Sequence, residues 1–213
     1  MTKLYLVRHG ETAWNAQNKI QGNMDTALND IGMKQAEFVA ARLAKENIDA
    51  LYTSSLKRAK ATAQKIAEQT KLEVKELHEF KEICLGPWEG LTIKEINEKY
   101  TEHYKIYRER PSDFNMPGAE TFLQVSERFC NAINNIIVQN IDKKIVIVSH
   151  GAAIKAAIIS ILGIDISHYN KFRIDNASIS ILNFSDNYHN GVVVECLNNT
   201  SHMEINKTNE SNK

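Results

Sequence analysis

Two histidines follow short apolar runs in the same way, and a glycine follows each of them. His9 comes after residues 4–7 and Arg8, and His150 comes after residues 145–149. A neutral imidazole nitrogen is a good nucleophile near pH 7, because its ordinary pKa is about 6.5. The planar guanidinium of Arg8 suits the oxygens of a phosphate group. These residue types therefore indicate chemistry on a bound anion.

The elements that must position these residues alternate along the chain. Apolar, β-prone runs predict strands, and apolar residues at helical spacing predict helices between them. The predicted strands cover residues 3–7, 48–54, 72–77, 144–149, 178–184 and 192–196, and the predicted helices cover residues 36–43, 59–67, 92–108, 122–136 and 154–161. Such alternation favours an α/β domain with a mostly parallel sheet that helices cover on both faces.

Ligands of an open α/β sheet bind beyond the carboxyl ends of its strands. We therefore expect His9 and His150 at one rim of the sheet. The stretch SSLKRAKATA follows the second predicted strand and brings Arg58 to the same rim, in the first turns of a helix. Arg8 and Arg58 are then placed to hold one anion.

The sequence predicts a single domain over residues 1–197, followed by a polar, aperiodic and disordered tail over residues 198–213. The DNYHNG stretch at residues 186–191 predicts a hairpin turn between the last two strands.

Charge and cysteine content limit the classes of partner. The chain has 213 residues with 26 Lys+Arg and 26 Asp+Glu, so its zero net charge favours neither nucleic acid nor an acidic membrane surface. The first apolar run is too short for a signal peptide, and no run approaches the roughly 18 apolar residues of a membrane span. Three widely spaced cysteines without a Cys-x-x-Cys motif predict reduced thiols in the cytoplasm and signal neither a zinc site nor a disulfide framework. No metal and no cofactor is expected.

Six motifs carry a resemblance to a known family. In chain order they are LVRHGETAWN, QGNMDTALNDIGMKQA, SSLKRAKATA, KEICLGPWEG, MPGAET and VSHGAA. Over roughly residues 3–185 the chain resembles the histidine phosphatase superfamily, the phosphoglycerate mutase-like proteins. It is most similar to the small broad-specificity and α-ribazole phosphate phosphatases. The resemblance implies a six-stranded, mostly parallel sheet with one antiparallel strand and helices on both faces.

The resemblance also implies a phosphate pocket. The first histidine of the family motif is a nucleophile that becomes phosphorylated, and this position is His9. Arg8, Arg58 and a protonated His150 would complete the pocket and neutralise the phosphate oxygens without a metal. Asn15 matches a residue that contacts the phosphoryl group.

Further positions match the acid and the substrate loop. Glu82 matches the general acid that protonates the leaving alkoxide, and Glu89, in the same motif, is the alternative acid. Gln21 and Gly22 lie where the family's substrate loop runs. Gly151, after the second histidine, is expected to let the backbone approach the ligand closely.

The expected function is metal-independent hydrolysis of small-molecule phosphomonoesters. The first alternative is a cofactor-dependent phosphoglycerate mutase, which would return the phosphoryl group to bound glycerate. The chain between Glu82 and His150 looks too short and too mixed in charge for the basic insertion of such mutases. A non-catalytic phosphate-binding protein and a metallohydrolase using His9 and His150 are weaker alternatives.

The segment over residues 100–120 is expected to set specificity, and Asn176 is expected to hold the His150 loop. The identity of the phosphate ester and the oligomeric state, a homodimer included, stay open at this point.

Overall fold

The computed structural model describes residues 1–185, 187 and 191–203 of the 213 residues. The strands are β1 (Thr2–Arg8), β2 (Ala50–Ser54), β3 (Val74–Leu77), β4 (Lys144–Ser149), β5 (Ile179–Phe184) and β6 (Val192–Asn199). The α-helices are α1 (Ala13–Ala16), α2 (Asp30–Leu43), α3 (Lys57–Thr70), α4 (Ile93–Lys99), α5 (Thr101–Glu109), α6 (Phe122–Gln139) and α7 (Gly151–Ile161).

The strands form one sheet in the order β3-β2-β4-β1-β5-β6. β3, β2, β4 and β1 pair in parallel, whereas β5 runs antiparallel to both β1 and β6. The predicted six-stranded sheet with one reversed strand is confirmed. β5 and β6 form the predicted hairpin, but most of the predicted turn lies outside the described residues.

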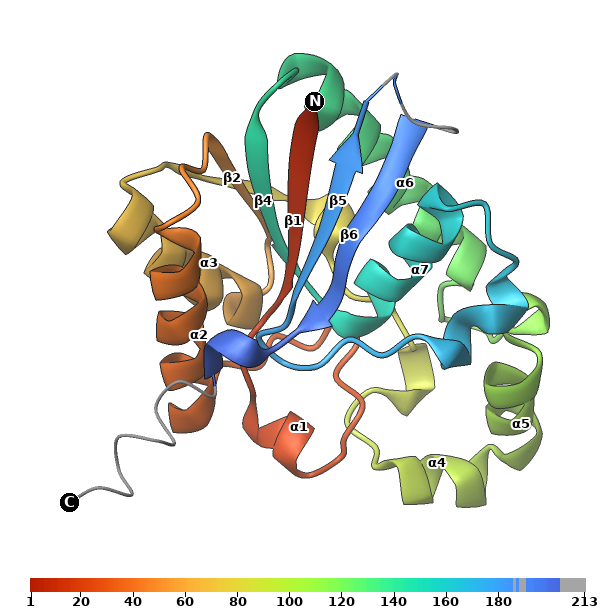
Figure 1. The fold of residues 1–213 in the computed structure, drawn as a ribbon. Coiled ribbons are helices and arrows are strands. Elements are labelled where there is room, and N and C mark those ends of the chain that lie inside the picture. The colour runs from red at the N-terminus through yellow and green to blue at the C-terminus, as the bar shows by residue number, and fades with distance from the viewer. Residues whose placement is uncertain (186, 188–190, 204–213) are drawn as a thin grey trace.

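Alternating side chains of the strands build an apolar core on each face of the sheet. Val7, Val146 and Val148 pack with residues of α2 and α3, whereas Leu6 and Ile147 pack on the other face with α6 and α7. Figure 1 shows α2 and α3 on one side of the sheet and α6 and α7 on the other. β1 runs from the N-terminus toward α1, so the carboxyl ends of the parallel strands face the irregular segments at the bottom of this view (Figure 1).

One predicted helix is interrupted in the structure. The sequence predicts a single helix over residues 92–108, but the chain forms α4 and α5 with a break at Tyr100, where φ is −131° and ψ is 39°. The indole of Trp88 lies 6.4 Å from the ring of Tyr100 and 5.4 Å from that of Tyr107, centroid to centroid. Trp88 is fully buried, and the rings of Tyr100 and Tyr107 both pack against it. This packing favours two short helices over one straight helix.

The predicted tail differs at its start. β6 extends to Asn199, and residues 201–203 form a 3₁₀ turn. The side chain of Asn198 bonds Asp175, and the buried His202 ring bonds the carbonyl of Ala177. We propose that the domain continues to Met203. The rest of the predicted tail lies outside the described residues.

Among the residues that the structure describes, no helix has the length and apolar character needed to cross a bilayer.

Candidate active site

Four of the predicted site residues meet at the carboxyl ends of β1, β2 and β4. Arg8 ends β1 and His9 follows it, while His150 follows β4 as the N-cap of α7. Arg58 lies in the first turn of α3, directly after β2. The imidazole centroids of His9 and His150 are 5.1 Å apart. The structure thus brings together the residues that the strand exits predict.

The ring of His9 is held in one orientation. Its Nδ1 lies 2.6 Å from the carbonyl oxygen of Gly10, and its Nε2 accepts a hydrogen bond of 3.2 Å from Nε of Arg58. A carbonyl only accepts, so we assign the proton to Nδ1. Burial first, and then the charges of Arg58 and Arg8, hold the pKa of His9 well below its usual value. Nε2 is therefore unprotonated, and its lone pair, which a nucleophile requires, accepts the hydrogen bond from Arg58.

Arg58 is fully buried and binds two carbonyl groups of the loop over residues 21–24, where the substrate loop is expected. Its Nη1 and Nη2 donate to the carbonyl oxygens of Met24 and Gly22, each at 2.7 Å. Burial lowers the pKa of Arg58 to about 10, so the group stays cationic at neutral pH. One guanidinium thus joins His9 to the loop that follows α1.

Arg8 packs directly against Gly151. A Cβ at Gly151 would lie 3.3 Å from Cζ of Arg8, so glycine gives the guanidinium room at the start of α7. Nη1 of Arg8 donates to the carbonyl of Ile174 at 2.6 Å, whereas its buried Nε has no hydrogen-bond partner among the described residues. An unpaired buried donor is costly, and an anion oxygen would satisfy it.

His150 is expected from the sequence to be protonated where it neutralises a bound phosphate. Its Nε2 lies 2.7 Å from Oγ of Ser54, and its buried Nδ1 has no partner among the described residues. Burial first, and then Arg58, His9 and Arg8, hold the pKa of His150 well below its usual value. The ring is therefore neutral in the ligand-free protein, because burial among cations disfavours a further positive charge.

Glu82 lies beside the start of α7. Its Oε1 accepts hydrogen bonds from the backbone N–H groups of Ile83 and Ala153, at 3.0 and 2.9 Å, and its Oε2 accepts one from Ala152 at 3.2 Å. These bonds orient the half-buried carboxyl group at the cavity that His9 also lines. The predicted acid is thus within the same site as the predicted nucleophile.

Glu89, the alternative acid, has a different environment. Its Oε1 accepts hydrogen bonds of 3.0 Å from the backbone N–H groups of Asn23 and Leu85. Gly22 has φ +48°, and a Cβ there would lie 2.0 Å from Oε1 of Glu89. Glu89 therefore links the loop over residues 21–24 to the KEICLGPWEG segment, and it does not line the cavity.

Asn15 and Gln21 also line the cavity, and hydrogen bonds orient their amide groups. Oδ1 of Asn15 accepts from the backbone of Thr12 and from Nδ2 of Asn176. Oε1 of Gln21 accepts from the hydroxyl groups of Thr12 and Thr26. With both oxygens engaged, the amide nitrogens are the ends left to contact an anion.

The expected role of Asn176 is wrong. Its Nδ2 also donates to the carbonyl oxygens of His9 and Gly10, at 3.1 and 3.3 Å, so Asn176 holds the His9 loop and not the His150 loop.

The cavity lined by Arg8, His9, Arg58 and Glu82 has a volume of about 140 Å³, and His150 is not among its lining residues. The motif reading missed part of its lining, namely Lys19, Ile20, Ile83, Leu85, Tyr107 and Ala152. Tyr107 falls within the segment expected to set specificity. Lys19 lies two residues before Gln21, but a lone lysine carries no pattern of its own.

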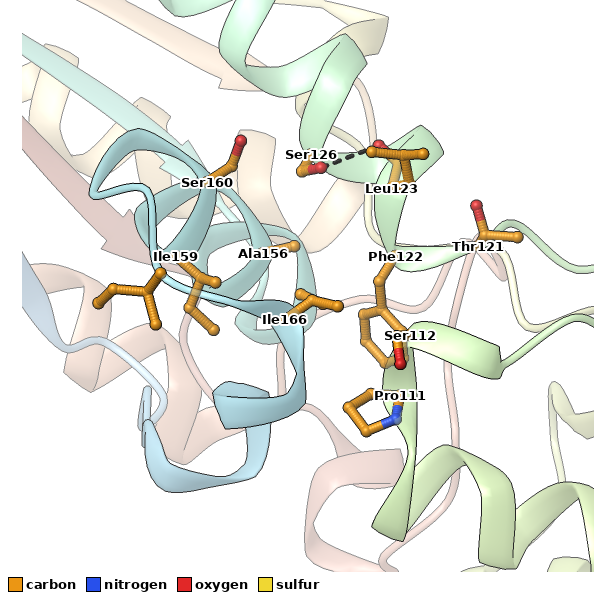
Figure 2. A pocket seen from close by; sticks show the side chains of 11 residues that line it. Pro111, Ser112, Thr121, Phe122, Leu123, Ser126, Ala156, Ile159, Ser160 and Ile166 are labelled. Carbon is orange, nitrogen blue, oxygen red and sulfur yellow. Dashed lines mark hydrogen bonds between the residues drawn. The ribbon is translucent and has the colours of Figure 1, made fainter.

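A separate hollow of about 410 Å³ lies between α6, α7 and the segments after α5 and α7. Figure 2 shows apolar side chains and serine or threonine hydroxyl groups around it, among them Phe122 and Ile159. No histidine, arginine or carboxylate lines it, so the larger hollow lacks the groups that the predicted chemistry needs.

Comparison with known proteins identifies relatives along nearly the whole chain. Residues 4–200 match the histidine phosphatase superfamily (branch 1). Phosphoserine phosphatase 1 of Hydrogenobacter thermophilus is 35% identical over 203 residues, which are 95% of this chain and 95% of that protein. The metal-independent phosphoserine phosphatase of Arabidopsis thaliana is 36% identical over 189 residues, 87% of this chain and 78% of that protein.

Solved structures agree with these relatives. A phosphoserine phosphatase mutant of Entamoeba histolytica, in complex with phosphoserine, has a TM-score of 0.85 at 38% identity and covers 95% of this chain and 100% of its own. Proteins named as probable phosphoglycerate mutases also match. The phosphoserine phosphatases among the relatives, one of them named as metal-independent, favour the hydrolase, so the predicted fold family and the predicted phosphatase activity are confirmed.

Proposed function

The chain belongs to the histidine phosphatase superfamily and is a phosphomonoesterase, and from this premise we propose that it works through a phosphohistidine on His9. The observation that carries the proposal is the lone pair on Nε2 of His9, directed by the Nδ1 contact with Gly10 and placed in a cavity with Arg8 and Arg58. Arg8, Arg58 and His150 bind the phosphoryl oxygens, and the amides of Asn15 and Gln21 add donors.

In the first step, Nε2 of His9 attacks phosphorus as the ester P–O bond breaks. Glu82, in its protonated form, gives its proton to the leaving oxygen, so an alcohol departs. The guanidinium groups stabilise the charge on the equatorial oxygens, which is the main task of a protein in phosphoryl transfer. Hydrogen bonds at the start of α7 keep Glu82 oriented for this transfer.

In the second step, water attacks the phosphohistidine. The carboxylate of Glu82 takes a proton from that water, the P–N bond breaks, and Nε2 of His9 regains its lone pair. Inorganic phosphate leaves, and Glu82 is protonated for the next turnover. Acid and base are the same residue in opposite halves of the cycle.

We propose that the substrate is a small phosphate ester that carries a carboxylate, such as phosphoserine. Relatives bear the name phosphoserine phosphatase, and solved neighbours hold phosphoserine or 3-phosphoglyceric acid. The cavity of about 140 Å³ suits a small ester. Lys19 and Tyr107 line it beyond the phosphate-binding groups and would attract a carboxylate.

We also propose a cytoplasmic location. Cys84, Cys130 and Cys196 are all free thiols, which is typical of a reducing compartment.

The covalent step is tested by rapid quenching with ³²P-labelled phosphoserine. The wild type should show an acid-labile phosphoenzyme, and His9→Ala should show none while losing activity by several orders of magnitude. Activity should persist in excess chelator. An acid-stable adduct, or near-normal turnover of His9→Ala, would refute the role of His9. Transfer of label to added glycerate, in place of release as phosphate, would favour the mutase.

The acid is tested by Glu82→Gln in a single turnover. An alkyl phosphate expels a basic alkoxide and needs the proton, whereas p-nitrophenyl phosphate expels a stable phenolate. Phosphorylation by the alkyl ester should slow by about 10²–10⁴-fold. The p-nitrophenyl ester should slow much less. Equal slowing of both would exclude Glu82 as the leaving-group acid.

A further inference from the structure

Glu82 lies in a segment without regular secondary structure. The chain leaves the 3₁₀ turn at residues 78–80 and reaches the next turn only at Gly86, so no sheet ladder or helix fixes the backbone of Glu82. The carboxyl oxygens of Glu82 nevertheless accept hydrogen bonds of 2.9–3.2 Å from backbone N–H groups at the start of α7, and these bonds require the backbone of Glu82 to stay in place. Some other group must therefore hold the segment.

Arg128 of α6 reaches that segment from the side. Its Nη1 donates to the carbonyl oxygens of Glu79 and Lys81, at 2.5 and 2.9 Å, and its Nη2 donates to the carbonyl oxygen of Glu82 at 3.0 Å. One guanidinium thus binds three backbone carbonyl groups within four residues.

Glu120 holds the same segment on the other side of Glu82. Its Oε2 accepts from the backbone N–H of Cys84 at 2.8 Å, and its own N–H donates to the carbonyl of Cys84 at 2.8 Å. Glu120 also binds Arg128 in a bidentate pair, with Nε–Oε1 at 2.8 Å and Nη2–Oε2 at 3.0 Å. The two side chains therefore form one ion pair that hydrogen-bonds the backbone both at Glu82 and at Cys84.

This pair differs from the exposed ion pairs of the protein. The side chains of Arg128 and Glu120 are 22% and 26% exposed, whereas those of Arg110 and Asp113 are 64% and 53% exposed. Planar bidentate geometry fixes direction as well as charge, and neither lysine nor glutamine reproduces it.

We propose that Arg128 and Glu120 are positioning residues for the general acid: they hold the backbone of Glu82 so that its carboxyl group meets the leaving oxygen. The inference rests on the proposed role of Glu82. Neither residue lines the cavity, and their charged groups are engaged with each other and with the backbone of the Glu82 segment. Displacing a reacting group by about 1 Å costs on the order of 10²-fold in rate.

The test compares Arg128→Gln with the wild type in the same single-turnover assay of His9 phosphorylation. The alkyl ester should slow by about 10–100-fold, and p-nitrophenyl phosphate by less than about 3-fold. Arg42→Gln is the matched control, because it breaks an ion pair with Glu46 that has no contact with the Glu82 segment. It should leave both substrates unchanged.

A double-mutant cycle separates positioning from general damage. In the Glu82→Gln background, Arg128→Gln should slow the alkyl ester by less than about 3-fold, since the acid it would position is already gone. Equal slowing of both substrates by Arg128→Gln, or full additivity with Glu82→Gln, would overturn the inference. If Glu82→Gln alone shows no dependence on the leaving group, the proposed acid has failed instead.

Glu120→Gln gives an independent answer if Arg128→Gln does not fold. It removes the charge but keeps the size, so selective slowing of the alkyl ester supports the inference and unselective slowing overturns it. Thermal unfolding of each variant shows that the folded protein is being compared.

Discussion

Acidification should lower the free energy of unfolding of the protein, because its two active-site histidines are buried in the neutral form. His9 and His150 are 2% and 0% exposed, and burial together with Arg58 and Arg8 holds the pKa of each well below its usual value. The native rings stay neutral when the pH falls below 6.5, whereas the same rings take up protons in the unfolded chain. Because the unfolded state then binds more protons, the free energy of unfolding falls with falling pH.

The magnitude follows from the unfolded pKa of about 6.5. Between pH 7.5 and pH 5.5, proton uptake by one unfolded histidine stabilises the unfolded state by about 1.4 kcal/mol, which is the upper bound for one ring and is reached when the native ring takes up no proton. Two rings give at most about 3 kcal/mol, a large part of the 5–15 kcal/mol that is typical of a domain. The stability that the two neutral rings contribute is present above pH 6.5, the unfolded pKa, and is lost as the pH falls from there toward the native pKa values.

Urea unfolding followed by tryptophan fluorescence, in phosphate-free buffers at pH 7.5 and 5.5, measures the loss. The pKa of His202 is also lowered, chiefly by burial, and shifts the wild type in the same direction. The decisive quantity is therefore a difference between variants: His150→Gln should reduce the loss by about 1.4 kcal/mol. His168→Gln is the control, since that ring is exposed and should change nothing. If His150→Gln keeps the full wild-type loss, the buried neutral ring is not its cause.

Two further substitutions test the phosphate pocket. Arg58→Lys should lower kcat/KM by at least about 10²-fold. The guanidinium of Arg58 binds His9 and the carbonyl oxygens of Gly22 and Met24 at the same time, and an ammonium group cannot replace it. Retention of more than a tenth of the wild-type kcat/KM would contradict this prediction. Gly22→Ala should lower Tm and raise KM by displacing Glu89, whereas Gly163→Ala, at a similar φ of +64° but with no atom within 4 Å of its Cβ, should affect only Tm.

The fold could be predicted because the spacing of apolar residues along the sequence is typical of the strand or helix that each segment forms. β1 and β4 are buried along most of their length, and their pattern is clear in the sequence. The break at Tyr100 could not be predicted, since α4 and α5 both continue a helical pattern. It depends on Trp88, a residue from another element, and packing of that kind leaves no local signal.

The same distinction applies to the site. Arg8, His9, Arg58 and His150 follow strands, so strand exits alone place them together. Glu82 lies on an irregular segment, and only the resemblance to a family pointed to it. Its two supports, Arg128 and Glu120, belong to α6 and to the segment before it, and no spacing in the sequence relates them to Glu82.

The neutral state of His150 has a consequence for the order of events. Two guanidinium groups and two imidazoles share one buried rim, and Nε of Arg8 and Nδ1 of His150 lack hydrogen-bond partners among the described residues. Such groups carry a desolvation cost that a phosphate dianion would offset. The arriving anion would also favour a proton on His150. We therefore propose that His150 takes up its expected proton only when phosphate binds, whereas the low pKa of His9 keeps its Nε2 unprotonated for attack.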